Sequence, residues 1–244
     1  MTIEQIHVAF ANGESSCLMD GEILDTLVKY HAIDAGNTLS LEPCKQGASV
    51  LLIETGSVKF IADGFEGTCG SGVFVPKPQS KVQIVAVKDS RILELQRFLT
   101  REEFRQYENS SQIPFLQAYE KAPTYTEDCK SAKTISRMLI PQRMIPRFAM
   151  GSVYTYGDDC VEAHEHPMLE QFFFSLPENN CTVSIDGLKV PFPGNALLHI
   201  PLGSLHGVES KGPQIIHYVW MDFLFGEEGL KYMDEAHRLS VGNN

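Results

Sequence analysis

The stretch "VEAHEHPMLEQFFF" at residues 161–174 places His164 and His166 one residue apart, with Glu170 four positions further on. Successive side chains of a β-strand point to opposite faces, so these three residues share one face if the strand continues without distortion. Imidazole and carboxylate groups are common ligands of divalent transition metals. The stretch therefore indicates either a metal site on a strand or only a histidine-rich strand edge.

A fourth ligand candidate, His206, follows the turn "PLGS" at residues 201–204. In a β-barrel a later strand can bring His206 opposite the first pair. Three neutral imidazoles and a carboxylate leave open positions on a six-coordinate ion, which is typical of catalytic rather than closed structural sites. Five of the eight histidines also fall between residues 164 and 217. Together these features favour the metal site over the strand edge.

Most of the remaining pattern is typical of short β-strands. Runs rich in β-branched and aromatic residues, bounded by glycine, proline or Asp-Gly turns, predict an antiparallel sandwich or barrel. Between the halves, Thr100 and Glu103 form a capping box that predicts a short helix within residues 98–111. Residues 226–239, acidic at the start and basic at the end, predict a C-terminal helix with Leu230 and Met233 on its buried side. The predicted strands occupy residues 49–56, 58–64, 72–76, 81–87, 170–176, 181–187, 195–201 and 214–223.

The two halves also resemble each other. When the Asp-Gly turn at 63–64 is aligned with that at 186–187, Lys81 falls opposite His206. Internal repetition of a β unit predicts two barrels of one type. We expect an N-terminal barrel over 1–97, a helical linker over 98–130, a C-terminal barrel over 131–225, and a helix and tail over 226–244. The HxH region falls near residues 40–49 of the first half, which contain no histidine, so we expect that barrel to be metal-free.

Composition limits the partners and the compartment. The net charge of −11 argues against nucleic acid or an anionic membrane as partner, because both select for basic patches. The N-terminus lacks the basic and apolar regions of a secretory signal, and no apolar run approaches the roughly 20 residues of a membrane helix. The six cysteines are scattered without a CxxC pair, as expected for reduced thiols. We therefore expect a cytoplasmic protein.

The motifs around the histidines resemble those of a known superfamily. Residues 157–170 and "GNALLHIPLGSLH" at 194–206 resemble the two cupin motifs, G-x5-HxH-x3,4-E and G-x5-PxG-x2-H, with each glycine spacing one residue longer here. The first motif normally ends in a glycine, where this chain has "SLPENN". The resemblance implies an all-β fold of two cupin (jelly-roll) barrels in tandem with short linking and C-terminal helices. It also implies one divalent transition metal (Zn, Mn, Ni or Fe) held by His164, His166, Glu170 and His206.

A narrower resemblance covers residues 134–235, which are similar to the 5-keto-4-deoxyuronate isomerases and the 5-deoxyglucuronate isomerases. Those enzymes are bicupins whose C-terminal barrel carries three histidines and a glutamate. Their glutamate lies one residue further from the HxH pair than Glu170 does. The resemblance implies a metal-dependent isomerase acting on a small sugar acid. As bicupins often associate, we also expect a homodimer or a higher homo-oligomer.

Isomerisation of this kind needs a base that moves a proton between adjacent carbons. Glu170, His199 and His217 are the candidates, although a histidine in such a position, like His199 or His217, is more often a structural residue. A uronate carboxylate would need a cation, and an arginine fork suits it. The substrate-binding candidates are two arginines, which can equally be ordinary surface residues, and two tyrosines on one strand face, which can line the pocket or merely pack: Arg137, Arg147, Tyr154 and Tyr156.

Two other interpretations use the same residues. A dioxygenase or a ureide-type amidohydrolase would employ the same ligands to activate oxygen or water. A non-catalytic cupin would bind metal or a small molecule without turnover. The identity of the metal and the need for oxygen separate these alternatives, and the sequence leaves them open.

Overall fold

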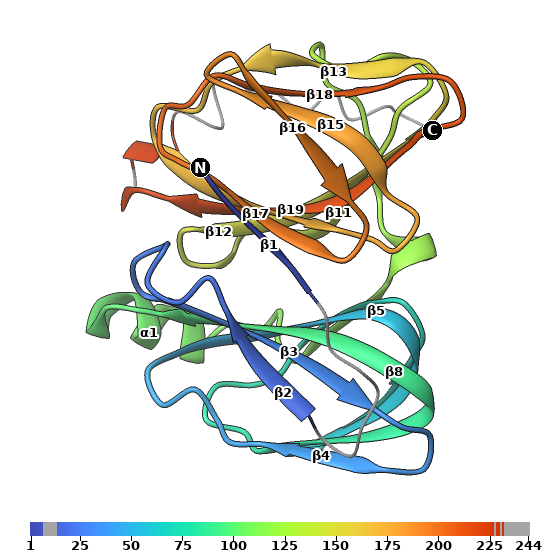
Figure 1. Ribbon diagram of the computed structural model, residues 1–244. Coiled ribbons are helices and arrows are strands. Elements are labelled where there is room, and N and C mark those ends of the chain that lie inside the picture. The colour runs from blue at the N-terminus through green and yellow to red at the C-terminus, as the bar shows by residue number, and fades with distance from the viewer. Residues whose placement is uncertain (7–13, 227, 230, 232–244) are drawn as a thin grey trace. The chain divides into compact units, whose positions relative to one another are not determined.

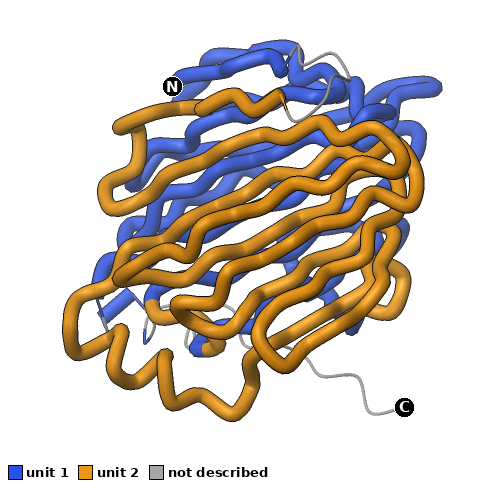
Figure 2. The backbone as a smooth tube through the Cα atoms, turned by 90° about the horizontal axis from the view of Figure 1, so that it is seen from below, with its two compact units in different colours: residues 1–6, 123–143, 147–244 blue, residues 7–122, 144–146 orange. Residues whose placement is uncertain are grey.

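The computed structural model describes residues 1–6, 14–226, 228–229 and 231, which form mostly antiparallel strands (Figure 1). The all-β fold that the sequence predicts is confirmed. The chain divides into two compact units (Figure 2). Unit 1 takes residues 1–6, 123–143 and 147–244, and unit 2 takes residues 7–122 and 144–146. The division at 122/123 falls inside the segment that the sequence assigns to a linker.

Unit 2 is built on one eight-stranded sheet with the order β2-β3-β8-β5-β7-β9, to which β4 adds by pairing with β8 and β6 by pairing with β5. Its core is apolar, and the rings of Phe60 and Phe74 stack there with centroids 4.5 Å apart. The strands are β2 (Glu14–Leu18), β3 (Thr26–Ile33), β4 (Thr38–Leu41), β5 (Gly47–Ala62), β6 (Phe65–Cys69), β7 (Gly72–Val75), β8 (Val82–Phe98) and β9 (Phe115–Ala118).

Unit 1 has two sheets, a seven-stranded one with the order β1-β17-β14-β19-β12-β11-β10 and a four-stranded one with the order β13-β18-β15-β16. Figure 1 shows β13, β15, β16 and β18 in one layer and β12, β17 and β19 in the other. The strands are β1 (Thr2–Gln5), β10 (Thr124–Tyr125), β11 (Ile135–Ile145), β12 (Phe148–Tyr156), β13 (Asp159–His164), β14 (Leu169–Ser175), β15 (Asn180–Ile185), β16 (Leu188–Pro193), β17 (Ala196–Ile200), β18 (His206–Ser210) and β19 (Ile215–Leu224).

The two units share one strand order. The series β2-β3-β8-β5-β7-β9 in unit 2 corresponds to β11-β12-β19-β14-β17-β1 in unit 1. In unit 2, β5 is one strand of 16 residues, whereas unit 1 has two strands, β14 and β15, in its place. Likewise β8 is one strand of 17 residues, whereas unit 1 has β18 and β19. The turns that the sequence aligned also correspond, since residues 63–64 join β5 to β6 and residues 186–187 join β15 to β16. Gly64 and Gly187 have φ of 69° and 82°, which favours glycine at both turns.

The predicted helix within residues 98–111 is confirmed as α1 (Arg101–Glu108). The backbone N–H of Glu103 donates to Thr100 Oγ1 at 3.3 Å, and the N–H of Thr100 donates to Glu103 Oε2 at 2.9 Å, so the capping box is present. A 3-10 helix, η1 (Tyr119–Lys121), follows β9. The predicted C-terminal helix, with Leu230 and Met233, lies largely outside the described residues. Within the described ranges, no helix has the length and apolarity to cross a membrane.

Alternation along β19 orients the side chains that matter for unit 1. Ile216 and Tyr218 join its apolar core, where the rings of Tyr218 and Phe173 stack with centroids 4.5 Å apart. Each such aromatic burial contributes about 1.5–3 kcal/mol relative to exposure. Because neighbouring residues point oppositely, His217 and Val219 face the other side of the sheet. The inner side of β19 therefore carries Tyr218 and Trp220, and His217 lies on the reverse.

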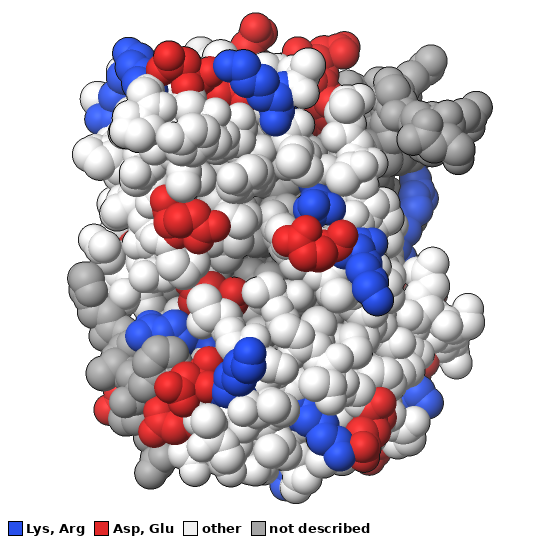
Figure 3. Space-filling model, turned by 90° about the vertical axis from the view of Figure 1, so that its right-hand side faces the viewer, with Lys and Arg blue, Asp and Glu red and all other residues white. Residues whose placement is uncertain are grey.

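The charged side chains drawn in Figure 3 are interspersed, with lysines and arginines lying close to aspartates and glutamates. Ion pairs occur at the surface of the protein, such as Lys59 with Glu66 at 2.6 Å and Lys189 with Glu209 at 2.7 Å. Exposed pairs of this kind contribute about 0–1 kcal/mol each. The described face in Figure 3 is thus an ordinary solvated surface of mixed sign.

Candidate metal centre

Three histidines converge in unit 1. Strands β13 and β18 are antiparallel neighbours, and their register places His164 directly opposite His206 after a bulge in β13. The nitrogen ligand atoms of His164, His166 and His206 all lie within 4.8 Å of one another. The ring centroids of His164 and His206 are 4.6 Å apart. The structure thus brings together the three histidines that the sequence selected, in an arrangement that could hold one metal ion.

Hydrogen bonds orient two of these rings. His164 Nδ1 lies 2.7 Å from the carbonyl oxygen of Glu162, and His206 Nδ1 lies 3.0 Å from that of Ser204. A carbonyl can only accept, so Nδ1 carries the hydrogen in both rings. In the neutral imidazole, Nε2 then bears the lone pair that a metal needs. His206 Nε2 is buried and has no hydrogen-bond partner among the described residues. These neutral donors fit a divalent transition metal.

The electrostatics of His206 agree with that role. The side chain is buried, with 2% of its surface exposed. Burial, and then the proximity of His164, lower the pKa of His206 to about 4. The imidazole is therefore neutral at physiological pH, as metal ligation requires.

The structure does not bring Glu170 to the triad. The strand ends at His164, and the turn at 167–168 intervenes before β14 begins at Leu169. This turn breaks the alternation that would have placed Glu170 beside His166. The carboxylate of Glu170 instead lies 3.4 Å from His199 Nε2, while Gln171 lines the cavity of the triad. On β14, the side chain that lines the cavity is thus Gln171 and not the expected Glu170.

Gln171 is itself held in place. Its Nε2 donates to Asp222 Oδ1 at 2.7 Å, and the two residues are direct partners across β14 and β19. Its Oε1 is buried and has no hydrogen-bond partner among the described residues. An amide oxygen is a neutral metal ligand, so Gln171 is the candidate for a fourth ligand where the sequence predicted a carboxylate.

The triad opens on a cavity of about 190 Å³. This volume is below the roughly 300–1,000 Å³ of drug-sized sites, so the cavity suits a small substrate. Aromatic side chains form much of its wall, among them Phe173, Tyr218 and Trp220. Besides the histidines, its polar lining includes Glu127, Lys130, Gln171 and Asp222.

One glycine makes room for the aromatic wall. Gly151 on β12 is the strand partner of Trp220, and a Cβ built on it would lie 2.3 Å from Trp220 Cζ2. Atoms cannot approach so closely, so any larger residue at 151 would displace the indole. The wall of the cavity therefore depends on a glycine in the neighbouring strand.

Solved structures share this architecture. The cupin 2 conserved barrel domain protein from Leptotrichia buccalis aligns with a TM-score of 0.62 at 11% identity, over 91% of this chain and 96% of its own. A mutant of Bacillus subtilis oxalate decarboxylase aligns with a TM-score of 0.70 at 12% identity, over 91% and 75%. An IolB-like protein from Salmonella typhimurium aligns with a TM-score of 0.70 at 11% identity, over 91% and 92%.

The chain has a cupin fold. No family model matches its sequence, and no curated protein matches it either. The likeness at 11–12% identity establishes the fold alone. Within this cupin fold, the HxH pair and the histidine after "PLGS" supply the triad, as the two cupin-like motifs predicted.

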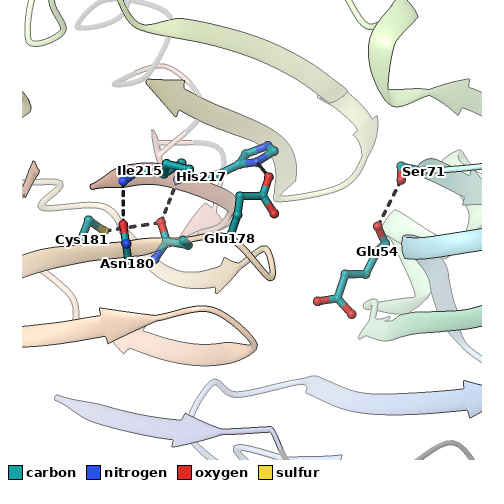
Figure 4. A network of polar contacts seen from close by, with 8 residues as sticks. Glu54, Ser71, Glu178, Asn180, Cys181, Ile215 and His217 are labelled. Carbon is teal, nitrogen blue, oxygen red and sulfur yellow. Dashed lines mark hydrogen bonds and ion pairs between the residues drawn. The ribbon is translucent and has the colours of Figure 1, made fainter. Parts of the chain in front are cut away.

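The two other histidines that the sequence proposed as bases lie elsewhere in the cupin fold. His199 lies beside Glu170 and packs edge-on against Phe172, with ring centroids 5.7 Å apart. His217 Nδ1 pairs with the carboxylate of Glu178, and Figure 4 shows the two side chains pointing toward one another. The described residues that line the cavity include neither histidine, nor Glu170. His217 does not reach the cavity because Tyr218 and Trp220 occupy the inner face of β19, and alternation turns His217 to the other face.

The predicted substrate-binding residues also lie away from the cavity of unit 1. Met138 lines it, so Arg137 faces the other side of β11. Arg147 occupies the turn between β11 and β12 with φ of 56°. The ring of Tyr154 packs edge-on against His217, at 5.0 Å between centroids, and Tyr156 is 60% exposed.

The cavity instead contains charged residues that sequence reasoning missed. Glu127 and Lys130 come from the segment before β11, which the sequence assigned to the linker, and Asp222 lies within the hydrophobic run of β19. No motif marks Glu127 and Lys130. For Asp222, the signal was available, since a carboxylate inside a predicted buried strand needs a partner.

Proposed function

We propose that this cupin is a metal-dependent enzyme that isomerises a small sugar acid at a mononuclear site in unit 1. The observation that carries the proposal is the convergence of His164, His166 and His206, within 4.8 Å, on a small cavity with charged walls. The similarity of residues 134–235 to the uronate isomerases supports the reaction class. The fold shared with an IolB-like protein is compatible with it.

The three imidazoles would hold the ion, and Gln171 Oε1 would add a neutral fourth ligand. A bound Zn, Mn, Ni or Fe ion would supply Lewis acidity, which polarises a substrate carbonyl and acidifies the adjacent carbon. The chain's own contribution is to keep the imidazole of His206 neutral through burial, and to orient the rings of His164 and His206 through the carbonyl contacts at Nδ1.

A base must lie inside the cavity to move a proton between adjacent carbons of the substrate. Two carboxylates line it, those of Asp222 and Glu127. Glu127 forms an ion pair with the ammonium group of Lys130, which neutralises its charge. Asp222 instead accepts a hydrogen bond from the amide of Gln171, which carries no charge. We therefore assign the proton transfer to Asp222. The aromatic wall of Phe173, Tyr218 and Trp220 would exclude water from the reaction.

A second candidate is oxidation or decarboxylation of a small carboxylic acid. The volume of about 190 Å³ favours it, since a compact acid would fit, and a solved oxalate decarboxylase shares the fold. The same histidines and the same cavity would serve this reaction. It differs from isomerisation in that carbon dioxide is released or oxygen is consumed.

Elemental analysis of the purified chain, followed by a sugar-acid screen monitored by NMR without oxygen, tests the proposal. We expect one transition-metal ion per chain and aldose–ketose conversion of a uronate that stops on chelation and returns with metal. Metal-loaded protein that converts no sugar acid would refute the isomerase. If it instead consumed oxygen or released carbon dioxide from oxalate, the second candidate would replace the first.

A further inference from the structure

The cavity of unit 1 contains a buried cation. The side chain of Lys130 is 8% exposed and lines the same cavity as the histidine triad. Among the described residues that line this cavity, it is the only lysine or arginine. Burying an ammonium group is costly unless the charge is paired, so its position on this wall requires an explanation.

The backbone of Lys130 is fixed to the strand that carries the triad. Lys130 forms an isolated antiparallel bridge with Val161 of β13. The N–H of Glu162 donates to the carbonyl of Cys129 at 2.8 Å. His164 lies three residues beyond Val161 on the same strand. The bridge therefore fixes the backbone of Lys130 beside the strand that carries His164.

The contacts of Lys130 leave N–H donors of its ammonium group for a ligand. Its ammonium group pairs with the carboxylate of Glu127 and lies 5.2 Å from the ring centroid of Tyr125. A lysine has three N–H donors, and the Glu127 carboxylate and the aromatic face do not use all of them. An anion in the cavity can thus share the ammonium group with Glu127.

We propose that Lys130 binds the carboxylate of the substrate and makes this site select acidic over neutral sugars, with Glu127 holding Lys130 in position. The inference rests on the proposed function for the class of substrate. Lys130 thus takes the role that was predicted for Arg137 and Arg147, neither of which lines the cavity.

Calorimetric titration of the metal-loaded full chain with D-glucuronate and with D-glucose tests the inference. Wild type should bind the acid more tightly. Lys130→Met keeps the length but removes the charge, so it should weaken glucuronate binding by about ten- to hundred-fold, with little effect on glucose. Lys133→Met is the matched control, because Lys133 is exposed and its Nζ donates to the carbonyl of Asp158 at 3.1 Å.

A second variant separates recognition from a merely structural role. Glu127→Gln keeps a side-chain oxygen that can accept a hydrogen bond from Lys130 and hold it in position, but it removes the competing negative charge. It should therefore tighten glucuronate binding, while Lys130→Met weakens it. Loss of a structural ion pair would instead change both variants in the same direction. Lys130→Arg keeps a positive charge and should retain the preference for the acid, even if Lys130→Met fails to fold. Metal content and thermal unfolding of every variant should be recorded.

The outcomes distinguish this inference from the proposed function. Preferential binding of glucuronate that depends on Lys130, without isomerisation, would leave the inference standing and refute the isomerase. Isomerisation of a uronate with the same KM in Lys130→Met and wild type would overturn the inference alone. Equal affinity of wild type for the acid and the neutral sugar, or no binding of either, would also overturn it.

Discussion

The two units pair their strands in the same way, but among the described residues only unit 1 gathers histidines that could hold a metal ion. In unit 1 the β13–β18 pair places the last residue of β13, His164, opposite the first residue of β18, His206. In unit 2 the β4–β8 pair places Leu41 opposite Val82 at the corresponding ends. Val82 is 3% exposed and belongs to the apolar core, against which Leu41 packs. One backbone arrangement therefore supports a ligand site or a core, according to the side chains at its ends.

A buried histidine in unit 2 makes the contrast sharper. His31 Nδ1 lies 2.6 Å from Ser15 Oγ, and His31 Nε2 lies 2.8 Å from Glu94 Oε2. Both ring nitrogens thus have partners within unit 2. In unit 1, by contrast, His206 Nε2 is buried with no hydrogen-bond partner among the described residues. Paired nitrogens are typical of a structural histidine, whereas a buried nitrogen without a partner, inside a cluster of three imidazoles, is what a metal ligand would present.

The largest expected effect follows from breaking the triad. His166→Ala should remove most of the bound metal and all activity, while the β-rich far-UV spectrum remains. His31→Ala is the contrasting variant. It should keep the metal but lose about 1–3 kcal/mol of stability, because the buried Glu94 loses one of its two hydrogen-bond partners and keeps Gln96. Elemental analysis and denaturant unfolding measure the two effects, and stoichiometric metal in His166→Ala would count against the site.

The next effect tests which residue of β14 faces the ion. Gln171→Ala should weaken metal binding by about ten- to hundred-fold, as loss of a supporting or ligating group does. Glu170→Ala should leave the affinity unchanged, because Glu170 contacts His199 instead. Chelator competition measures both affinities. The reverse ranking would show that Glu170, not Gln171, reaches the metal.

A smaller effect concerns pH and unit 2. Burial raises the pKa of Glu94, but hydrogen bonds from His31 and Gln96 outweigh it and leave the pKa below its ordinary value of 4.5. The unfolded chain therefore takes up a proton at higher pH than the folded one. The stability contributed by Glu94 is present above pH 4.5 and is lost as the pH falls through the folded-state pKa.

Glu94→Gln should accordingly flatten the decline of unfolding free energy below pH 4.5. Denaturant unfolding of wild type and variant at a series of pH values measures this. The metal content above that pH should be the same in both proteins, since Glu94 belongs to unit 2. Parallel acid profiles would contradict the assignment.

The smallest effect is expected for Lys81→Ala. Lys81 is 60% exposed and pairs at the surface with Glu42 at 2.6 Å, a contact worth about 0–1 kcal/mol. Metal content should not change, because unit 2 presents Leu41 and Val82 where unit 1 has histidines. A fall in metal by about half would instead mean that unit 2 also binds an ion.

Local sequence patterns were sufficient to predict the structural elements that depend only on residues close together in the chain. The capping box of Thr100 and Glu103, the Asp-Gly turn at 186–187 and the strand that carries His164 follow from propensity and alternation over a few residues. The repeat alignment was less accurate. It set Lys81 opposite His206, whereas the strand pairing puts Val82 there. A shift of one residue turns a side chain to the other face, so the residue in that position is apolar rather than charged.

The sequence by itself determined the all-β fold, the two similar units and the three histidines, because strand alternation and turn chemistry are local. Only the tertiary structure decided which other residues line the cavity beside the three histidines. Because the turn at 167–168 interrupts the strand, Gln171 lines the cavity and Glu170 does not. The bridge to Val161 places Lys130 beside the strand that carries His164. These outcomes depend on where one turn resets the alternation and on contacts between distant residues, and neither is encoded in the spacing of a motif.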